Sequence, residues 1–418
     1  MDKKTLILHL VAGIEGGAAI SGVRIHRALQ GAGFNSCLRT RDDVVETVDI
    51  NVGVLRWERL WDKIRVEFVG RVIARLAGLL TGRRKLFQAV VWSGWYEYAC
   101  RMKPDCVFIH WASEEMLSMR DIRRIAARWP TFFVCHDMWL ATVDEHYVEP
   151  ASFEDRYTAP KTNAGAGMLE TWLFRRKRAA LLGLGGIVCP SQWMLSCVRA
   201  STVTRQVPAA CVAYPIDLQV FSPAPDRPAV RRALGLEEGT PVMLFGAASL
   251  TDRRKGGDLM AGIADRCASL LGRPLVVLTF GAGKFPAVEN PWLRVVEMGF
   301  IQSEVDLVRL YQASDVYVLP TRMDNLPNSA VEAVACGVPV AGFRIGGMSD
   351  IVQHGEIGFL AEPFELDALC AGIVEVLERG IEFYAPQCRG HAEATFDPAK
   401  IAEDYAGLVS RLVASREN

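Results

Sequence analysis

Residues 315–342 read DVYVLPTRMDNLPNSAVEAVACGVPVAG, and this stretch is the most informative part of the chain for its fold. An apolar run at 316–319 is typical of a buried strand, and a second apolar run follows at 338–341. Between them lie a loop rich in Pro and Asn and then a short helix. In a parallel α/β sheet, loops at the carboxyl ends of strands are where ligands usually bind. We therefore predict a ligand site at this loop.

Two carboxylates, those of Asp324 and Glu332, flank the start of that helix and have seven residues between them. Amide groups at a helix N-terminus favour anions, and a carboxylate on each side can accept hydrogen bonds from sugar hydroxyls. The pattern predicts a site for a sugar that carries a phosphate. An alternative is a capping box, since Ser329 is followed three residues later by Glu332, and such a box needs no ligand.

Composition narrows the class of protein. The 418 residues provide for roughly two to three domains, and the net charge of −1 argues against nucleic acid as a partner. Eleven cysteines without a CxxC pair argue against a disulfide framework or structural zinc and favour the cytoplasm. No run reaches the ~20 apolar residues that span a bilayer, so we expect a soluble or peripherally attached protein. The N-terminal apolar run is interpreted as a first strand and not as a signal peptide.

Short apolar runs alternate with segments of helical period, which predicts two parallel sheets covered by helices. The first set is TLILHLVA, DCVFIHW, TFFVCHD and GGIVCPS; the second is VMLFGAA, PLVVLTFG, LRVVEMG, VYVLP and VPVAG. The proline-rich residues 215–236 lie between the two sets and are interpreted as a domain linker. We predict two Rossmann-like α/β domains that face each other across a cleft.

A basic loop follows the first strand of the second set. Arg253, Arg254 and Lys255 precede the pair Gly256 and Gly257. Arginine forks, a lysine charge and glycines that admit close backbone approach are suited to bind a diphosphate. A solvated turn with its charges in water is the alternative.

Further glycine pairs occupy similar turns. Gly16 and Gly17 lie between the first strand and a helix expected near Ser21, where amides can approach a phosphate. The surrounding GIEGGAAISG does not fit GxGxxG, which disfavours a nicotinamide dehydrogenase. Gly346 and Gly347 could likewise meet a phosphate or could begin a helix capped by Ser349.

Histidines end two strands of the first set. His136 could hold a sugar hydroxyl or shuttle a proton, or it could only be hydrogen-bonded within a loop. His110 is a second candidate of the same kind. With Glu145 and His146 these residues could suggest a metal site, but their spacing matches no ligand pattern, so we predict no metal.

Residues 56–86 have helical period, with Trp57 and Trp61 on an apolar stripe and lysines and arginines opposite. Such a basic amphipathic helix suits an anionic membrane surface. The alternative is a helix that packs on its own domain and exposes a charged face to water.

Taken together, these residues resemble glycosyltransferase family 4, whose members have the GT-B fold and use nucleotide-sugar donors with retention of configuration. The likeness is strongest over residues 240–365. It implies that Asp324 faces the donor sugar, Glu332 the ribose, and the amides of Asn325 and Leu326 the sugar. It also implies that Lys255, with Arg254 or Arg253, binds the diphosphate.

The resemblance extends to the N-terminal half, where it implies roles for Gly16 and Gly17 as a phosphate loop and for His136 as a catalytic residue. Phe300 would begin the segment that meets the base. Two departures stand out: Asp324 is one methylene shorter than the family's glutamate, and the usual Gly-Arg-Leu of the basic loop is replaced by GAASLTDRRKG.

The resemblance implies a metal-independent, retaining hexosyltransferase that uses a UDP- or GDP-sugar in surface polysaccharide synthesis. FVCHDMW, CPSQWM and the DNLPN loop are similar to the branch that builds exopolysaccharide, O-antigen or colanic-acid-type chains. We expect an acceptor domain over residues 1–213, a donor domain over 214–397 and a helix over 398–418 that packs back on the first domain. The acceptor would be a polysaccharide or a lipid-linked saccharide, and the protein would be cytoplasmic or peripheral on the inner membrane face. A non-catalytic nucleotide-sugar-binding scaffold is the alternative, and a sugar-phosphate isomerase a remoter one.

Overall fold

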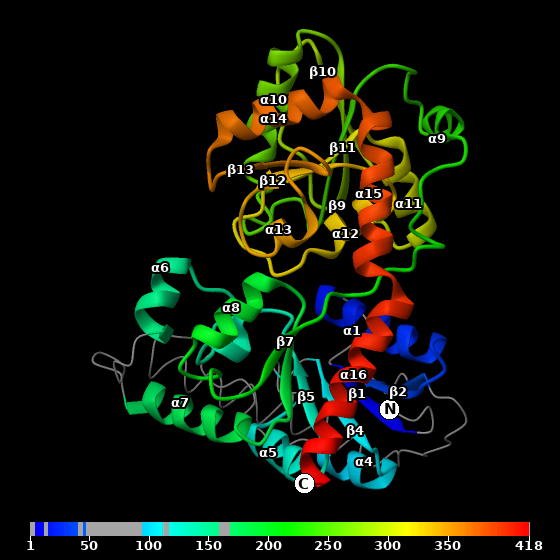
Figure 1. Cartoon of the computed structure of the whole chain (residues 1–418). Helices are drawn as coiled ribbons and strands as arrows, with labels where there is room; N and C mark the ends of the chain where they lie inside the picture. Colours follow the sequence, from blue (N-terminus) through cyan, green and yellow to red (C-terminus); the bar gives the residue numbers. More distant parts are fainter. Residues whose placement is uncertain are drawn as a thin grey trace. The chain divides into compact units, whose positions relative to one another are not determined.

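The computed structural model describes residues 5–11, 16–40, 45–46, 94–110, 112, 117–158 and 168–417. The chain divides into two compact units (Figure 1). Unit 1 comprises Met1–Tyr214 together with Pro398–Asn418, and unit 2 comprises Pro215–Asp397. The segment 56–86, predicted to be a basic amphipathic helix, lies outside the described residues.

Within the described residues, unit 1 contains β1 (Leu6–Val11), α1 (Gly17–Gly31), β2 (Asn35–Thr40), β3 (Val45–Glu46), α4 (Trp95–Met102), β4 (Cys106–Ile109), α5 (Met119–Arg128), β5 (Thr131–Val134), the 3₁₀ turn η2 (Met138–Ala141), α6 (Pro150–Phe153), the π-helical turn η3 (Glu154–Thr158), α7 (Met168–Leu181), β6 (Gly186–Cys189), α8 (Gln192–Ala200), β7 (Ala209–Cys211) and α16 (Pro398–Glu417). Its sheet has the order β3-β2-β1-β4-β5-β6-β7. The strands pair in parallel except at β3, which is antiparallel to β2. The prediction of an all-parallel sheet is therefore wrong at this edge, because so few residues separate β2 and β3 that only a hairpin can join them.

The described elements of unit 2 are α9 (Arg227–Ala233), β8 (Val242–Ser249), α10 (Met260–Leu271), β9 (Leu275–Ala282), β10 (Leu293–Glu297), α11 (Glu304–Ala313), β11 (Val316–Leu319), α12 (Asn328–Ala335), β12 (Val340–Phe343), α13 (Met348–Ile351), β13 (Gly358–Ala361), α14 (Leu366–Arg379) and α15 (Ile381–Phe396). Its strands follow the order β10-β9-β8-β11-β12-β13, and every pair is parallel.

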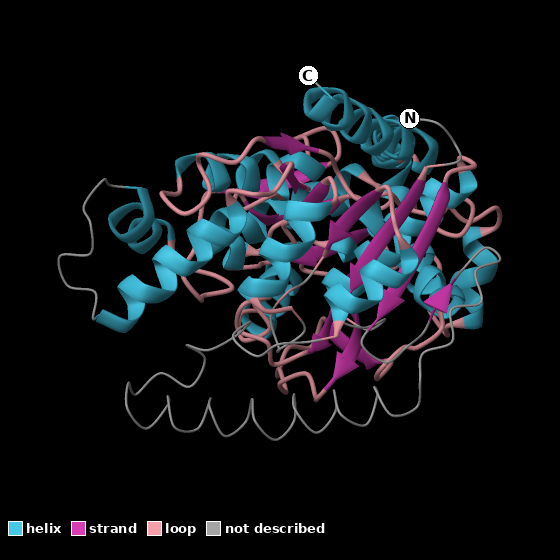
Figure 2. Cartoon of the chain, turned by 90° about the horizontal axis from the view of Figure 1, so that it is seen from below, coloured by secondary structure: helices cyan, strands magenta, loops and turns pink. Residues whose placement is uncertain are grey.

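Both sheets therefore have the strand order of a doubly wound α/β domain, with helices beside the strands in Figure 2. The order reverses between β1 and β4 in unit 1 and between β8 and β11 in unit 2. At such a reversal the helices leave opposite faces of the sheet, and a crevice opens at the carboxyl ends of the two strands. Each predicted strand is present, and the predicted two-domain α/β fold class is confirmed.

The decisive stretch forms β11, α12 and β12. All four residues of β11 are fully buried, as expected for a central strand of a parallel sheet. The second strand begins at Val340, two residues later than predicted. The reason is Pro339, which has no N–H to donate to a neighbouring strand and contributes only its carbonyl, which accepts from the Tyr317 N–H at 2.9 Å.

Residues 215–236, predicted to be a linker, belong to unit 2 and are anchored to it by a few buried side chains. Ile216 and Phe221 are buried, and Arg231 of α9 pairs with Asp315 at 3.2 Å. The main-chain N–H of Ile216 donates to the carbonyl of Phe396 at 3.0 Å. The prolines therefore shape a packed segment that begins where the chain leaves unit 1.

The C-terminal helix α16 is part of unit 1 and packs beside α1. Its Tyr405 is fully buried, and its ring centroid lies 5.4 Å from that of Phe108 in β4.

Candidate functional site

In unit 2 the loops that follow β8 and β11 meet at the strand reversal. The carbonyl of Arg254 accepts two hydrogen bonds from the second loop, one from the Thr321 hydroxyl at 2.9 Å and one from the Arg322 N–H at 2.8 Å. These bonds fix the basic loop beside the loop that carries Asp324. The two features that the sequence marked separately are therefore one site.

The Asp324 carboxylate is the centre of this site. Its Oδ2 accepts from Lys255 Nζ and from Arg254 Nη1, the latter at 3.3 Å. Arg254 Nη1 also donates to the carbonyl of Met323 at 3.0 Å. Asp324 is only 7% exposed, so these charge-assisted bonds form in a partly desolvated place where they are strong.

Arg253 points elsewhere. Its side chain is 82% exposed, and its Nε lies 3.5 Å from a carboxylate oxygen of Asp258. Arg322 forms a fork to the same carboxylate, with N–O distances of 2.5 and 2.9 Å. Of the two arginines that the resemblance left open, the structure places Arg254 beside Lys255, and Arg253 remains at the surface.

The glycines of the basic loop serve close packing of backbone on backbone. A Cβ on Gly256 would lie 2.1 Å from the carbonyl oxygen of Pro320, and one on Gly257 would lie 2.0 Å from that of Leu250. Gly256 also has a φ of +78°, which favours glycine. A larger residue at Gly256 would push the basic loop away from the end of β11, and one at Gly257 would push it away from the end of β8.

Glu332 is held from behind by a tyrosine. Its Oε2 accepts from the Tyr311 hydroxyl at 3.1 Å, and the carboxylate is 7% exposed. Burial and the nearby Glu332 charge raise the pKa of Tyr311 well above its usual value, so the hydroxyl remains a donor. The capping-box alternative is wrong, because α12 has Pro327 as its N-cap and no side-chain cap. Glu332 is thus oriented by tertiary contacts.

Asn325 and Leu326, predicted to offer amides to a sugar, are buried in the same loop. The Asn325 N–H donates to Asp324 Oδ1 at 3.0 Å, so it helps to orient the carboxylate. The Gly347 N–H donates to the Asp324 carbonyl at 3.2 Å. The glycine pair begins α13, as the alternative predicted, but the N-cap is Gly347 without a side-chain bond, so the predicted cap at Ser349 is wrong.

Phe300 is not brought to this cluster by any observed contact. It follows β10, which is separated from β8 by β9, and its side chain is 63% exposed. It lies at the carboxyl end of the sheet, and its role in base binding stays a prediction.

In unit 1 the glycine pair begins α1. Gly16 is the N-cap with a φ of +88°, and Gly17 is the first helical residue, four residues before the start expected at Ser21. No atom lies within 4 Å of a Cβ built on Gly16, so its backbone conformation and not crowding calls for glycine.

His136 follows β5, and both of its ring nitrogens have partners in unit 1. Nδ1 lies 2.7 Å from the Tyr214 hydroxyl, and Nε2 lies 3.2 Å from Nδ1 of His110. Burial lowers the pKa of His136 to about 3, so the ring is neutral at pH 7. A ligand hydroxyl that binds a ring nitrogen must therefore displace one of these two partners.

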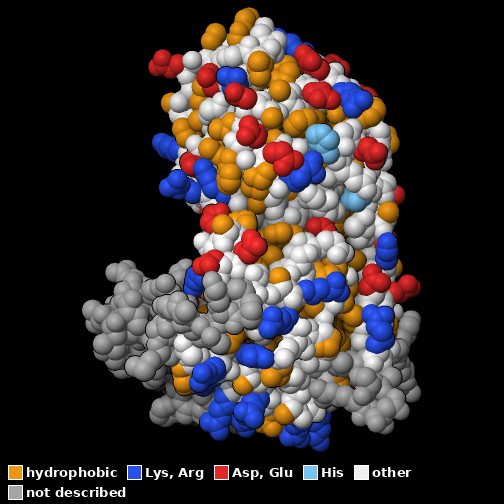
Figure 3. Space-filling model, turned by 60° about the vertical axis from the view of Figure 1, so that its left-hand side comes forward, with side chains coloured by type: hydrophobic (Ala, Val, Ile, Leu, Met, Phe, Trp, Pro, Cys, Tyr) orange, Lys and Arg blue, Asp and Glu red, His pale blue; other side chains and the backbone are white. Residues whose placement is uncertain are grey.

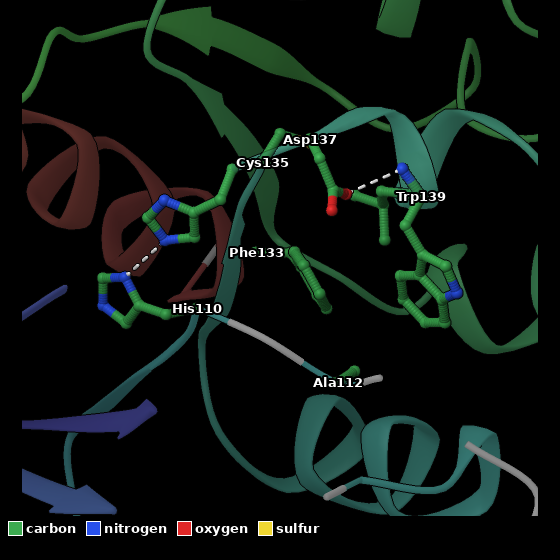
Figure 4. A pocket seen from close by; sticks show the side chains of 8 residues that line it. His110, Ala112, Phe133, Cys135, Asp137 and Trp139 are labelled. Atoms are coloured by element: carbon green, nitrogen blue, oxygen red, sulfur yellow. Dashed lines mark hydrogen bonds between the residues drawn. The ribbon is translucent and has the colours of Figure 1, made fainter. Parts of the chain in front are cut away.

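A small hollow lies beside these histidines (Figure 4). Its lining includes His110, His136, Asp137 and the rings of Phe133 and Trp139. Sequence reasoning missed Tyr214 and the buried His9, which bonds to His110. Neither residue lies at the end of a predicted strand, so no local sequence signal marked them.

The residues weighed as a metal site have separate partners. His146 Nδ1 bonds to Asp137 at 2.6 Å, and Glu145 accepts from Tyr157 at 2.6 Å. Among the described residues, no group of three or more His, Cys, Asp or Glu side chains could hold a metal ion.

Comparison with solved structures identifies the fold. Sucrose-phosphate synthase from Thermosynechococcus elongatus superposes with a TM-score of 0.64 at 17% identity, covering 99% of this chain and 100% of that one. The Anabaena protein Alr3699/HepE in complex with UDP-glucose gives a TM-score of 0.61 at 17% identity, covering 97% and 99%. This chain has the GT-B fold.

The match to a family model lies within unit 2. Residues 241–379 match the family model of glycosyl transferases group 1. A D-inositol 3-phosphate glycosyltransferase from Mycolicibacterium gilvum is 32% identical over 209 residues, which are 48% of this chain and 46% of that protein. The enzyme of that name from Thermobifida fusca is 32% identical over 162 residues, which are 35% and 36%. The chain spans less than half the length of these curated relatives.

Proposed function

We propose that this protein is a glycosyltransferase that moves a hexose from a UDP- or GDP-sugar to a saccharide acceptor, with retention of configuration at the anomeric carbon. The observation that carries the proposal is the pairing of Lys255 and Arg254 with Asp324 at the strand reversal of unit 2. The match of residues 241–379 to glycosyl transferases group 1 supports it. So does the fold shared with the Anabaena protein, whose complex contains UDP-glucose.

In the proposed reaction the bond between the anomeric carbon and the diphosphate breaks, and the leaving group takes the electron pair. Lys255 and Arg254 stabilise the negative charge that grows on it. Because Asp324 holds both cations by one oxygen atom, they are oriented before the donor binds. The two cations therefore need no further rearrangement as the charge develops.

Retention requires the acceptor hydroxyl to attack on the face from which the diphosphate leaves. We propose that the departing phosphate takes the hydroxyl proton, since the Asp324 carboxylate is occupied by two cations and an amide. The reaction then needs no metal, because lysine and arginine do the work of charge neutralisation. Glu332, oriented by Tyr311, is suited to accept hydrogen bonds from the ribose.

For the acceptor we propose a lipid-linked saccharide of a surface polysaccharide, met at the inner face of the membrane. Lys and Arg side chains gather over the lower part of the face in Figure 3, which is unit 1. On this unit α5 carries the exposed Arg120, Arg123 and Arg128, and Trp172 of α7 is 45% exposed. Exposed arginines on one helix and an exposed tryptophan on a helix that contacts it favour an anionic bilayer surface. No described helix has the length and apolar character needed to cross a bilayer.

A thermal-shift screen with UDP, GDP, ADP and their common sugar conjugates, in buffer with EDTA, tests donor binding. Ligand at a hundredfold excess over its dissociation constant should stabilise the protein by about 2.7 kcal/mol. The same ligand should give a much smaller shift with Lys255→Ala and an unchanged shift with Arg253→Ala. Transfer to saccharide acceptors and NMR of the anomeric proton of the product then test activity and retention. Binding without turnover of any donor would favour the scaffold alternative, and absence of a shift with every nucleotide would refute the proposal.

A further inference from the structure

A row of three histidines and a tyrosine runs through unit 1 from its core towards the hollow. His9 Nδ1 lies 2.9 Å from His110 Nε2, and His110 Nδ1 lies 3.2 Å from His136 Nε2, the bond dashed beside His110 in Figure 4. His136 Nδ1 lies 2.7 Å from the Tyr214 hydroxyl. Neighbouring rings in the row are stacked, with centroids 5.2 to 5.4 Å apart. His9 and His110 are fully buried, and Tyr214 is 4% exposed.

Each ring in this row is neutral, because burial lowers the pKa of His9, His110 and His136. A neutral imidazole has one N–H and one bare nitrogen, so it donates on one side and accepts on the other. Each of the three hydrogen bonds needs one donor. The tautomer of one ring therefore dictates the tautomer of the next, and the row has only two complete arrangements.

The two arrangements differ in what they leave unsatisfied. If Tyr214 donates to His136, each ring carries its proton on Nε2, and the last N–H, on His9, has no acceptor among the described residues. In the reverse arrangement the Tyr214 hydrogen has no acceptor there, and the bare Nε2 of His9 also lacks a donor. The first arrangement leaves fewer buried polar groups unpaired and is favoured.

We propose that His9, His110, His136 and Tyr214 form one hydrogen-bonded chain in which Tyr214 sets the tautomer of all three histidines. Tyr214 and His110 are positioning residues that hold the His136 ring from both sides, at the edge of the hollow that His110 and His136 line. Tyr214 is also the last residue of unit 1 before the chain enters unit 2. The hydrogen bond thus ties His136 to the point where the chain leaves the unit.

Tyr214→Phe tests the proposal because it removes the hydroxyl and keeps the ring. Without that donor, the Nδ1–H arrangement leaves its unpaired N–H on His136, which is partly exposed, whereas the Nε2–H arrangement leaves it on the fully buried His9. All three histidines should therefore switch together from the Nε2–H to the Nδ1–H form. The measurement is a multiple-bond ¹⁵N–¹H NMR spectrum of the full chain labelled with ¹⁵N-histidine, with peaks assigned by single substitutions. His354 is the internal reference, because its Nδ1 accepts from the Leu360 N–H at 3.1 Å in unit 2.

Three switched signals with an unchanged His354 support the chain. A switch confined to His136, or no switch at all, overturns it. His110→Asn gives a second test, since it interrupts the row. In that background Tyr214→Phe should leave the His9 tautomer unchanged, and a change there would contradict the proposed connection.

The positioning role rests on the proposed glycosyl transfer and is measured separately. Tyr214→Phe should lower kcat by about tenfold or more, as expected for a misplaced group in an active site, with an unchanged KM for the donor, because the proposed diphosphate site lies in unit 2. Switched tautomers with an unchanged kcat would overturn the positioning role. A wild-type protein without transfer activity would refute the proposed function instead, and the NMR result would still decide the chain.

Discussion

Gly346→Ala should distort the candidate site, because the added methyl group would clash with the backbone of Asp324. A Cβ on Gly346 would lie 1.8 Å from the carbonyl oxygen of Asp324 and 3.0 Å from its carbon. The neighbouring Gly347 N–H donates to that same oxygen at 3.2 Å. Backbone cannot rotate away as a side chain would, so the loop that carries Asp324 must move relative to Lys255.

The expected magnitude separates into two parts, and Gly355→Ala is the matched control. Both glycines have positive φ, +59° at Gly346 and +85° at Gly355. For alanine this backbone conformation costs about 1–2 kcal/mol. No atom lies within 4 Å of a Cβ on Gly355, so the control carries this cost alone. Gly346→Ala adds the cost of shifting a packed backbone, about 1–3 kcal/mol more.

The assay is thermal unfolding followed by circular dichroism, with nucleotide binding measured by calorimetry. For a unit of this size, 1 kcal/mol corresponds to a shift of about 2–4 °C in Tm. Gly355→Ala should lower Tm by about 2–8 °C and leave binding intact. Gly346→Ala should lower it further and weaken binding of the nucleotide. Equal Tm values with equal affinities would refute the reasoning that close packing on Asp324 shapes the site.

Three further predictions concern single side chains. Lys255→Ala should weaken nucleoside diphosphate binding about tenfold to a hundredfold, as expected for a lost charge-assisted bond. Arg253→Ala, at an exposed residue, should leave binding unchanged. An equal loss of affinity in titration calorimetry would contradict the assignment of Lys255, and not Arg253, to the diphosphate site. Tyr311→Phe should lower the free energy of unfolding by about 1.5–3 kcal/mol, because it removes the hydrogen bond from the Tyr311 hydroxyl to Glu332 Oε2; an unchanged urea midpoint would speak against that contact. The pKa of His136 is about 3 in the folded protein against 6.5 ordinarily, so only the unfolded chain binds this proton between these values, and stability should fall as pH drops from 6.5 towards 3. For this group the free energy of unfolding changes by at most about 1.4 kcal/mol per pH unit. Urea unfolding at pH 7.5 and 5.5 should show a smaller loss of stability for His136→Gln than for the wild type. The same loss in both proteins would refute this.

Local pattern was enough to predict the strands and the importance of the loop after β11. Buried strands of a parallel sheet are continuous apolar runs, and β11 is one. Turn chemistry then marked the loop, and charge marked the basic run at 253–255. The order of the strands in each sheet was not predicted, because the alternation of strands and helices is compatible with several orders.

The pairing of edge strands and the contacts between residues distant in sequence could not be predicted from local pattern. The short β3 pairs antiparallel, and residues 215–236 pack into unit 2 although their prolines indicate a linker. Prolines mark where regular structure stops, whereas burial depends on what the rest of the chain places against them.

The sequence by itself determined the fold class, the position of the candidate site at the ends of β8 and β11, and the types of charge that gather there. Only the tertiary structure decided which arginine joins Lys255 at Asp324, that Glu332 is oriented by Tyr311 and not by a cap, and that His136 belongs to a row with His110 and His9. The physical reason is the range of the forces. Periodicity and turn chemistry act over a few residues, whereas a hydrogen bond or an ion pair forms only between atoms that folding has brought within about 3–4 Å.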